Sequence, residues 1–263
     1  MLLIRHGRTT ANADGTLAGW TPGVHLDDTG RAQVSRLAAR LSDVPLAEIV
    51  TSPLERCQET TAILVGEGRD GHASSPSPPV CVDERIAEAR YGDWTGRPLK
   101  ELSRDALWPV VQAHPSAVRF PGGESLLQMQ LRAVTALREH NDDVARRYGE
   151  DAVWAAVSHG DVIKAVVADA LGLHLDQFQR IATDPASVTV ILYTRLRPFV
   201  VRLNDSGPDL GPLVAALAKV DTSDAAVGGG AGPDTGPAPA APAEHRSAPA
   251  ATAGSGSPPP DHA

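Results

Sequence analysis

Residues 1–9 read MLLIRHGRT, and this stretch decides how the rest of the sequence is interpreted. The apolar run at residues 1–4 is typical of a short buried strand. It leads directly into Arg5, His6 and Gly7, where a glycine permits a sharp turn beside a cation and an imidazole. Strand ends that open into loops hold ligand chemistry in α/β proteins, and an arginine fork suits an anionic substrate. A histidine bonded to the backbone would give the same tripeptide, so both interpretations stay open here.

A second histidine-glycine junction lies far along the sequence. Residues 151–157 are mostly alanine and valine around Trp154 and predict another buried strand, which is followed by His159 and Gly160. Apolar residues at helical spacing then continue to residue 172. Because a helix N-terminus presents free N–H groups to anions, both junctions are placed where a phosphate group would bind. This internal parallel favours a ligand-binding role for His6 and His159.

The composition indicates a globular protein of one or two domains, with 263 residues of which 42% are hydrophobic. A formal charge of −8 and a pI near 5.5 argue against binding to nucleic acid. No apolar run approaches the roughly 18 residues of a membrane span, and the first residues do not resemble a signal peptide. We therefore expect a cytoplasmic protein without a membrane partner. Cys57 and Cys81 lack the spacing of zinc ligands and are expected as free thiols in the core.

Hydrophobic periodicity between the junctions alternates strands with helices, which predicts an α/β fold. The helix expected over residues 125–147 carries its core face on Leu127, Leu131, Val134 and Leu137. Other helices are expected from an N-cap at 27–29 to residue 42, from residue 52 onward and over 99–111. Strands are expected at 47–51, 80–82, 187–194 and 198–203, and loops at 9–22 and 66–79.

Arg56 is a candidate ligand for an anion. Ser52, Pro53 and Glu55 form a capping box that predicts a helix start, which places Arg56 in the first turn. The helix dipole disfavours a cation there unless an anion lies nearby. Either Glu55 or Glu59 supplies that anion as a surface ion pair, or a bound ligand does, and the sequence leaves both hypotheses open.

Asn12 and a carboxylate of residues 83–96 are the remaining candidates. Asn12 can hydrogen-bond an anion or stabilise a turn, and the turn is favoured. Residues 83–96 place carboxylates beside Tyr91 and Trp94, and burial against such rings raises a carboxyl pKa as acid–base catalysis requires. The pattern does not choose between Glu84 and Glu88, and a solvated loop is the alternative.

Four motifs in this order resemble the histidine phosphatase superfamily, phosphoglycerate-mutase-like branch, over about residues 1–203. They are Arg5-His6-Gly7, Ser52-Pro53-Leu54-x-Arg56, Glu88-x-x-Tyr91-Gly92 and Ser158-His159-Gly160, with Pro121-Gly122-Gly123-Glu124-Ser125 between the third and the fourth. The resemblance implies that His6 is the nucleophile that forms a phosphohistidine and that Glu88 is the proton donor. It also implies that the phosphoryl oxygens are bound by Arg5, Asn12, Arg56 and His159.

The residue types suit that chemistry. Phosphoryl transfer needs fixed positive charge and alignment, which the two arginines and a protonated His159 would supply. His6 must be neutral to attack, and a backbone carbonyl bonded to its other nitrogen would select the tautomer. Glu88 would protonate the leaving alkoxide and then take a proton from the hydrolytic water. The sequence shows no Asp/His cluster suited to a metal, so we expect no metal and no cofactor.

Three features depart from the family pattern. Residues 19–26 resemble its Gly-Trp-x-Asp-x-x-Leu segment but lack the Asp and are one residue longer. Arg8 stands where Gln or Glu is usual, and it either adds charge at the mouth of the site or points to solvent. The first strand begins at the very start of the sequence, where family members usually have several more strand residues. We therefore expect a start upstream of Met1, which mass spectrometry of the native protein tests.

The predicted fold is a three-layer α/β/α sandwich with a mainly parallel sheet, with both histidines at the carboxyl ends of neighbouring strands. Residues 1–205 form the expected catalytic domain. Residues 206–263 form an acidic Pro/Ala/Gly-rich tail that is expected to be largely disordered, with a possible short helix over 213–220.

The expected function is metal-independent hydrolysis of a small phosphorylated metabolite by a monomer or homodimer. The alternative is a cofactor-dependent phosphomutase of the phosphoglycerate mutase type. Such mutases carry a long basic insertion where residues 93–122 are short here, which favours hydrolysis. A catalytically silent phospho-ligand binder is the third hypothesis, and replacing His6 by Ala separates it from an enzyme.

Overall fold

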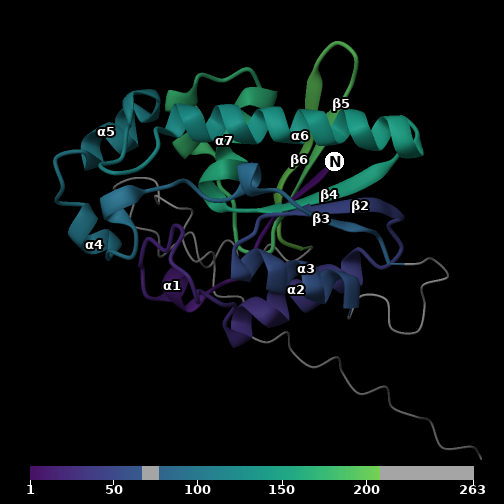
Figure 1. The fold of residues 1–263 in the computed structure, drawn as a ribbon, viewed down its shortest axis with the longest axis horizontal. Coiled ribbons are helices and arrows are strands. Elements are labelled where there is room, and N and C mark those ends of the chain that lie inside the picture. Colours follow the sequence, from purple (N-terminus) through teal and green to yellow (C-terminus); the bar gives the residue numbers. More distant parts are fainter. Residues whose placement is uncertain (67–76, 208–263) are drawn as a thin grey trace, which may run out of the picture.

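The computed structural model describes residues 1–66 and 77–207, which form three layers (Figure 1). A six-stranded sheet in the order β3-β2-β4-β1-β5-β6 lies in the middle. Helices α2 (Asp28–Arg40) and α3 (Glu55–Gly66) cover one face, and α6 (Leu126–Tyr148) and α7 (Gly160–Ala170) cover the other. The predicted α/β/α sandwich is therefore confirmed. The tail and its helix over 213–220 lie outside the described residues.

The sheet is parallel over four strands. These are β1 (Leu2–Arg5), β2 (Leu46–Thr51), β3 (Val80–Val82) and β4 (Val153–Ser158). Strand β5 (Val188–Tyr193) runs antiparallel to β1, and β6 (Pro198–Asp205) runs antiparallel to β5. The carboxyl ends of the parallel strands meet at one edge of the sheet, where α/β proteins bind ligands.

Strand β1 lies inside the sheet and is buried on both faces, which its apolar run requires. Leu3 packs into the core under α6 and α7, whereas Leu2 and Ile4 pack into the core under α2 and α3. The register of β1 with β4 pairs Arg5 with Ser158. His6 and His159, one residue further on, are therefore neighbours at the same sheet edge, as predicted.

The predicted core face of α6 is partly wrong. Leu127 and Leu131 are 54% and 68% exposed, whereas Val134 and Leu137 are buried as expected. The buried face instead carries Leu126, Met129, Ala133, Val134, Ala136, Leu137 and Val144. Small alanines lie on this face, so a choice based on the largest apolar residues misplaced it by about one position.

Local hydrogen bonds change three other predicted boundaries. The expected helix over 99–111 is two helices, α4 (Leu99–Leu102) and α5 (Trp108–Ala113), because the Asp105 carboxylate accepts from the Leu107 N–H and forms a turn between them. Helix α3 begins at Glu55 and not at Pro53. The predicted loop at 9–22 contains α1 (Thr10–Ala13). Short 3₁₀ turns occupy Glu84–Ile86 (η2), Gly92–Trp94 (η3), Pro115–Ala117 (η4) and Leu175–Arg180 (η5).

The two cysteines differ in burial. Cys57 is a free thiol in the core, as expected, but Cys81 is exposed because its strand β3 lies at the edge of the sheet. None of the helices in residues 1–66 and 77–207 is long and apolar enough to cross a membrane.

Candidate active site

His6 lies at the carboxyl end of β1 and is only 3% exposed. Its Nδ1 is 2.7 Å from the carbonyl oxygen of Gly7. Because a carbonyl can only accept, Nδ1 carries the proton and Nε2 keeps its lone pair. Burial, together with the charges of Arg56 and Arg5, holds the pKa of His6 well below its ordinary value. His6 is therefore a neutral imidazole near pH 7.

Arg56, in the first turn of α3, reaches the same ring. Its Nε donates to His6 Nε2 at 3.3 Å and its Nη2 donates to the Gly19 carbonyl at 2.8 Å. Its Nη1 is buried and has no hydrogen-bond partner among the described residues. Since buried donors are normally paired, this nitrogen suits an anionic ligand. The surface ion-pair hypothesis fails because Arg56 is buried.

His159 lies beside His6, with ring centroids 5.2 Å apart and planes at 60°. Its Nε2 is bonded to the Ser52 hydroxyl at 2.7 Å, and this hydroxyl also accepts from the Leu54 N–H at 3.3 Å. The predicted capping box does not form, because the Ser52 N–H donates to the Val157 carbonyl. Burial, then Arg56 and His6, hold the pKa of His159 well below its ordinary value. This direction is opposite to the expectation of a protonated His159, chiefly because the ring is fully buried and also because Arg56 lies nearby.

Glu88 is the buried carboxylate of the site. It is 4% exposed, and its Oε1 accepts from the Ala89 N–H at 2.9 Å. Burial, helped by the negative charge of Asp161, raises its pKa to about 7. The other candidate, Glu84, has a side chain that is 66% exposed and pairs with Arg90. The structure therefore leaves Glu88 as the carboxyl that can hold a proton near neutral pH.

A buried polar network adjoins Glu88. The Tyr91 hydroxyl donates to Asp161 Oδ2 at 2.8 Å, and Lys164 Nζ is 3.5 Å from Asp161 Oδ1. Lys164 also donates to Gln179 at 3.1 Å. Asp161 was not predicted as a site residue, although it directly follows the second His-Gly junction. Its negative charge next to Glu88 is an electrostatic feature of the site.

Arg5 and Asn12 occupy different positions. Arg5 is fully buried, and its Nη1 donates to the Thr183 carbonyl at 2.7 Å. Burial lowers the pKa of Arg5 to about 10, so its guanidinium remains charged at neutral pH. The side-chain oxygen Oδ1 of Asn12 accepts from the Thr9 N–H and hydroxyl at 3.1 and 2.9 Å, so the oxygen of this amide stabilises the turn, as favoured.

One pocket gathers four of the six predicted site residues, namely His6, Asn12, Arg56 and Glu88. The pocket has an empty volume of about 430 Å³, part of it open to solvent. The other described lining residues carry no formal charge and are Thr9, Ala11, Gly15, Thr16, Leu17, Ala18, Gly19, Tyr91 and Leu99. Arg5 and His159 are fully buried and are not among the described lining residues.

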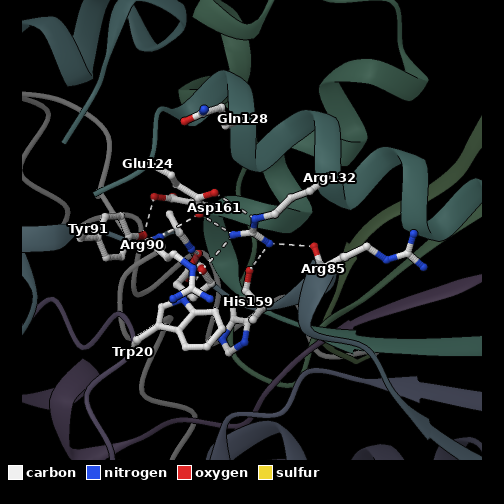
Figure 2. Close-up of polar contacts among 12 residues, drawn as sticks. Trp20, Arg85, Arg90, Tyr91, Glu124, Gln128, Arg132, His159 and Asp161 are labelled. Atoms are coloured by element: carbon white, nitrogen blue, oxygen red, sulfur yellow. Dashed lines mark hydrogen bonds and ion pairs between the residues drawn. The ribbon is translucent and has the colours of Figure 1, made fainter. Parts of the chain in front are cut away.

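Two of the three departures from the family pattern contact neighbouring elements. Arg8 pairs with Asp27 at 2.8 Å and donates to the Thr29 hydroxyl at 2.7 Å, so it is turned towards α2. Trp20 donates its indole N–H to the Glu88 carbonyl at 2.6 Å, and the Arg90 guanidinium stacks on its ring at 3.9 Å (Figure 2). Trp20 therefore contacts the segment that carries the buried carboxylate.

This site contains two neighbouring histidines, two buried arginines and one buried carboxyl with a raised pKa. The sequence model of the histidine phosphatase superfamily, branch 1, matches residues 1–206. The chain belongs to the histidine phosphatase superfamily. This confirms the resemblance that the four motifs carry.

Relatives within the histidine phosphatase superfamily include both phosphatases and mutases. Phosphoserine phosphatase 1 of Hydrogenobacter thermophilus is 29% identical over 209 residues, which cover 78% of this chain and 91% of the relative. A 2,3-bisphosphoglycerate-dependent phosphoglycerate mutase of Gloeobacter violaceus is 27% identical over 183 residues, covering 69% and 80%. The solved structure of Bacillus stearothermophilus YhfR superposes with a TM-score of 0.68 at 29% identity, covering 78% of this chain and 96% of that one. Sequence identity therefore does not separate hydrolysis from mutase activity.

Proposed function

We propose that this member of the histidine phosphatase superfamily hydrolyses a small phosphomonoester through a phosphohistidine at His6, without a metal. The observation that carries the proposal is the state of His6. Its Nε2 lone pair is set by the Gly7 carbonyl and lies in a pocket shared with Arg56 and Glu88. A nucleophile, a fixed cation and a carboxyl with a pKa of about 7 are thus within one small volume.

The first step forms the covalent intermediate. His6 Nε2 gives up its hydrogen bond from Arg56 Nε and attacks phosphorus, and the bond from phosphorus to the leaving oxygen breaks. The proton of Glu88 passes to that oxygen, which leaves as an alcohol. Arg56 and Arg5 balance the negative charge on the phosphoryl oxygens, and Asn12 and His159 donate hydrogen bonds to them.

The second step regenerates the enzyme. Water attacks the phosphorus of phospho-His6 while the Glu88 carboxylate takes one proton from that water. The bond between phosphorus and Nε2 breaks and inorganic phosphate leaves. His6 is again neutral, with its proton on Nδ1, and Glu88 is again protonated.

The pocket lining supports hydrolysis over mutase activity. A bisphosphate-dependent mutase must hold a second anionic group while phospho-His6 is protected from water. Arg56 is the one side chain with a permanent positive charge among the described residues that line the pocket. The nearby Arg8 and Arg90 are engaged with Asp27 and Glu84. The described lining therefore offers little that would retain a bisphosphate.

Phosphate release from a panel of monoesters in the presence of EDTA tests the proposal. We expect turnover by the wild type, and we expect His6→Ala to lose both turnover and acid-labile phosphoenzyme. His25→Ala is the matched control, because His25 is exposed and pairs with Glu59 away from the pocket lining. Interconversion of phosphoglycerates that requires a bisphosphate would favour the mutase. Phosphate binding without turnover would favour the silent binder.

We also propose that the enzyme acts in the cytoplasm as a monomer or homodimer. Cell fractionation and light scattering test these two statements, and recovery of the protein in a membrane or secreted fraction would contradict the first.

A further inference from the structure

Arg132, near the start of α6, reaches across to the segment that carries Glu88 (Figure 2). Its Nη1 donates to the carbonyl oxygens of Arg85 and Ala87, both at 2.7 Å. Its Nη2 donates to the Glu88 carbonyl at 3.0 Å. Three backbone carbonyls, one in the η2 turn and two directly after it, thus bond to one guanidinium. A planar fork of donors can satisfy all three, which a lysine ammonium cannot do with the same geometry.

Glu124 accepts hydrogen bonds both from the Arg132 guanidinium and from the backbone of the segment that carries Glu88. Its carboxylate accepts from Arg132 Nε at 3.0 Å and from Arg132 Nη2 at 2.5 Å. It also accepts from the backbone N–H of Arg90 at 2.8 Å. The Arg132 and Glu124 side chains are only 20% and 12% exposed. The charged hydrogen bonds between them therefore contribute more to the free energy of folding than those of a solvated surface pair. The pair therefore holds the chain on both sides of Glu88.

Trp20 holds the Glu88 carbonyl from another direction. Its indole N–H shares that oxygen with Arg132 Nη2. The Glu88 carboxyl is bonded to the N–H of Ala89, the next residue in the chain. The position of the carboxyl in the pocket is thus set by its own backbone, and the backbone is set by these donors.

We infer that Arg132 is a positioning residue that holds the Glu88 carboxyl at the leaving-group oxygen, an inference that rests on the proposed function. A general acid acts only within hydrogen-bond reach of the oxygen that it protonates. A displacement on the order of 1 Å costs roughly a hundredfold in rate. Replacing the Arg132 guanidinium would allow the Glu88 carboxyl to move by such a distance, while every group proposed to contact the phosphate stays in place.

The leaving group distinguishes this role from a general structural one. An alkyl phosphate releases a strongly basic alkoxide and needs the proton of Glu88, whereas p-nitrophenyl phosphate releases a stable phenolate and does not. The value of kcat/KM reports steps up to leaving-group departure, so it isolates the protonation step. For R132M and R132K we expect kcat/KM to fall roughly tenfold to a hundredfold with glycerol phosphate. With p-nitrophenyl phosphate we expect a change of at most about threefold.

Two further variants complete the experiment. R138M is the matched control, because Arg138 lies on the same helix and pairs with Asp169 at 2.7 Å without touching the Glu88 segment. It should leave both substrates within about twofold of wild type, as surface substitutions usually do. E124Q weakens the hydrogen bonds that hold the Arg132 guanidinium. It should lower kcat/KM for glycerol phosphate, and not for p-nitrophenyl phosphate, by a smaller factor than R132M does. If R132M does not fold, R132K carries the same test with the charge retained.

Each outcome decides the inference. A loss confined to the alkyl ester supports Arg132 as a positioning residue. Equal losses for both esters, or no loss for either, would overturn it while leaving the hydrolase intact. A wild-type protein that releases phosphate from no ester would overturn the proposed function and the inference with it.

Discussion

Arg56 donates its Nε–H to Nε2 of His6 across 3.3 Å, while the Gly7 carbonyl accepts from the other ring nitrogen at 2.7 Å. Both contacts require the same neutral tautomer. The ring is therefore held in the tautomer that the proposed attack needs, and its Nε2 lone pair stays bonded to Arg56 until a phosphorus atom replaces that contact. Such preorganisation removes part of the reorganisation that the reaction would otherwise require.

Replacing Arg56 by Lys should lower kcat/KM roughly a hundredfold to a thousandfold, because an ammonium lacks the planar fork of donors that binds two phosphoryl oxygens together. Steady-state kinetics with inhibition by inorganic phosphate measures the effect. Arg31→Lys is the control, since Arg31 is half-exposed and pairs with Glu59. Activity of R56K within about threefold of wild type would exclude a role for Arg56 in the transition state.

The pH profile should show the titration of Glu88. With its pKa raised to about 7, Glu88 holds its proton below that pH and loses it above. We expect kcat/KM for an alkyl phosphate to fall as the pH rises through about 7. E88Q should be much less active and should lack this basic limb. Persistence of the limb in E88Q would assign it to another group.

The Glu88 carboxyl should also lower the free energy of unfolding as the pH rises from about 4.5 to about 7. Between the ordinary pKa of 4.5 and the folded value of about 7, the folded protein binds more protons at Glu88 than the unfolded chain does. Its free energy of unfolding therefore falls as pH rises through this window. Urea unfolding should find E88Q more stable than wild type by roughly 1–3 kcal/mol at pH 8, and little changed near pH 4.5. Equal stability at pH 8 would mean that burial of Glu88 imposes no cost.

Asp161→Asn should move the basic limb to lower pH. The amide keeps an acceptor for the Tyr91 hydroxyl but removes the negative charge that helps to raise the pKa of Glu88. The pH dependence of kcat/KM measures the shift. Asp169→Asn, on the same helix, removes an exposed pair with Arg138 and should leave the profile unchanged. A limb that stays in place in D161N would show that burial alone raises the pKa.

Gly92→Ala should destabilise the protein more than Gly172→Ala. Both glycines have positive φ, +54° and +67°, so each substitution incurs a strain of roughly 1–2 kcal/mol. A Cβ at Gly92 would also lie 2.0 Å from the Pro121 carbonyl oxygen, whereas nothing lies within 4 Å at Gly172. Denaturant unfolding should give G92A an additional loss of roughly 1–3 kcal/mol. Equal losses would show that the Gly92 and Pro121 segments separate easily.

Much of the fold was predictable because its signals are local. The apolar runs before His6 and His159 fix two neighbouring strands, and polar caps at Asp27 and Ser125 fix two helix starts. The face of α6 was not predictable in the same way. Burial of Leu126 in place of Leu127 depends on how closely alanines allow the helix to approach its neighbours.

The site was predictable in its residue types more than in its electrostatics. The motifs pointed to four residues that line one pocket, but burial decided between Glu84 and Glu88. The lowered pKa of His159 depends first on its burial and then on its distance from Arg56, neither of which the sequence spacing encodes. Arg132 gave no signal, because a single arginine on an amphipathic helix is ordinarily a solvated residue. Its three carbonyl partners come together only in the folded chain.

The pairing of β1 with β4 has a consequence for how the molecule is assembled. Strand β1 precedes all the other strands in sequence, yet it lies between β4 and β5, the partners that are synthesised late. Contacts so distant along the chain carry a large entropy cost of loop closure and form slowly. His6 can therefore be brought beside His159 only after β4 has been synthesised. The return of activity during refolding should report the moment at which the first strand is enclosed.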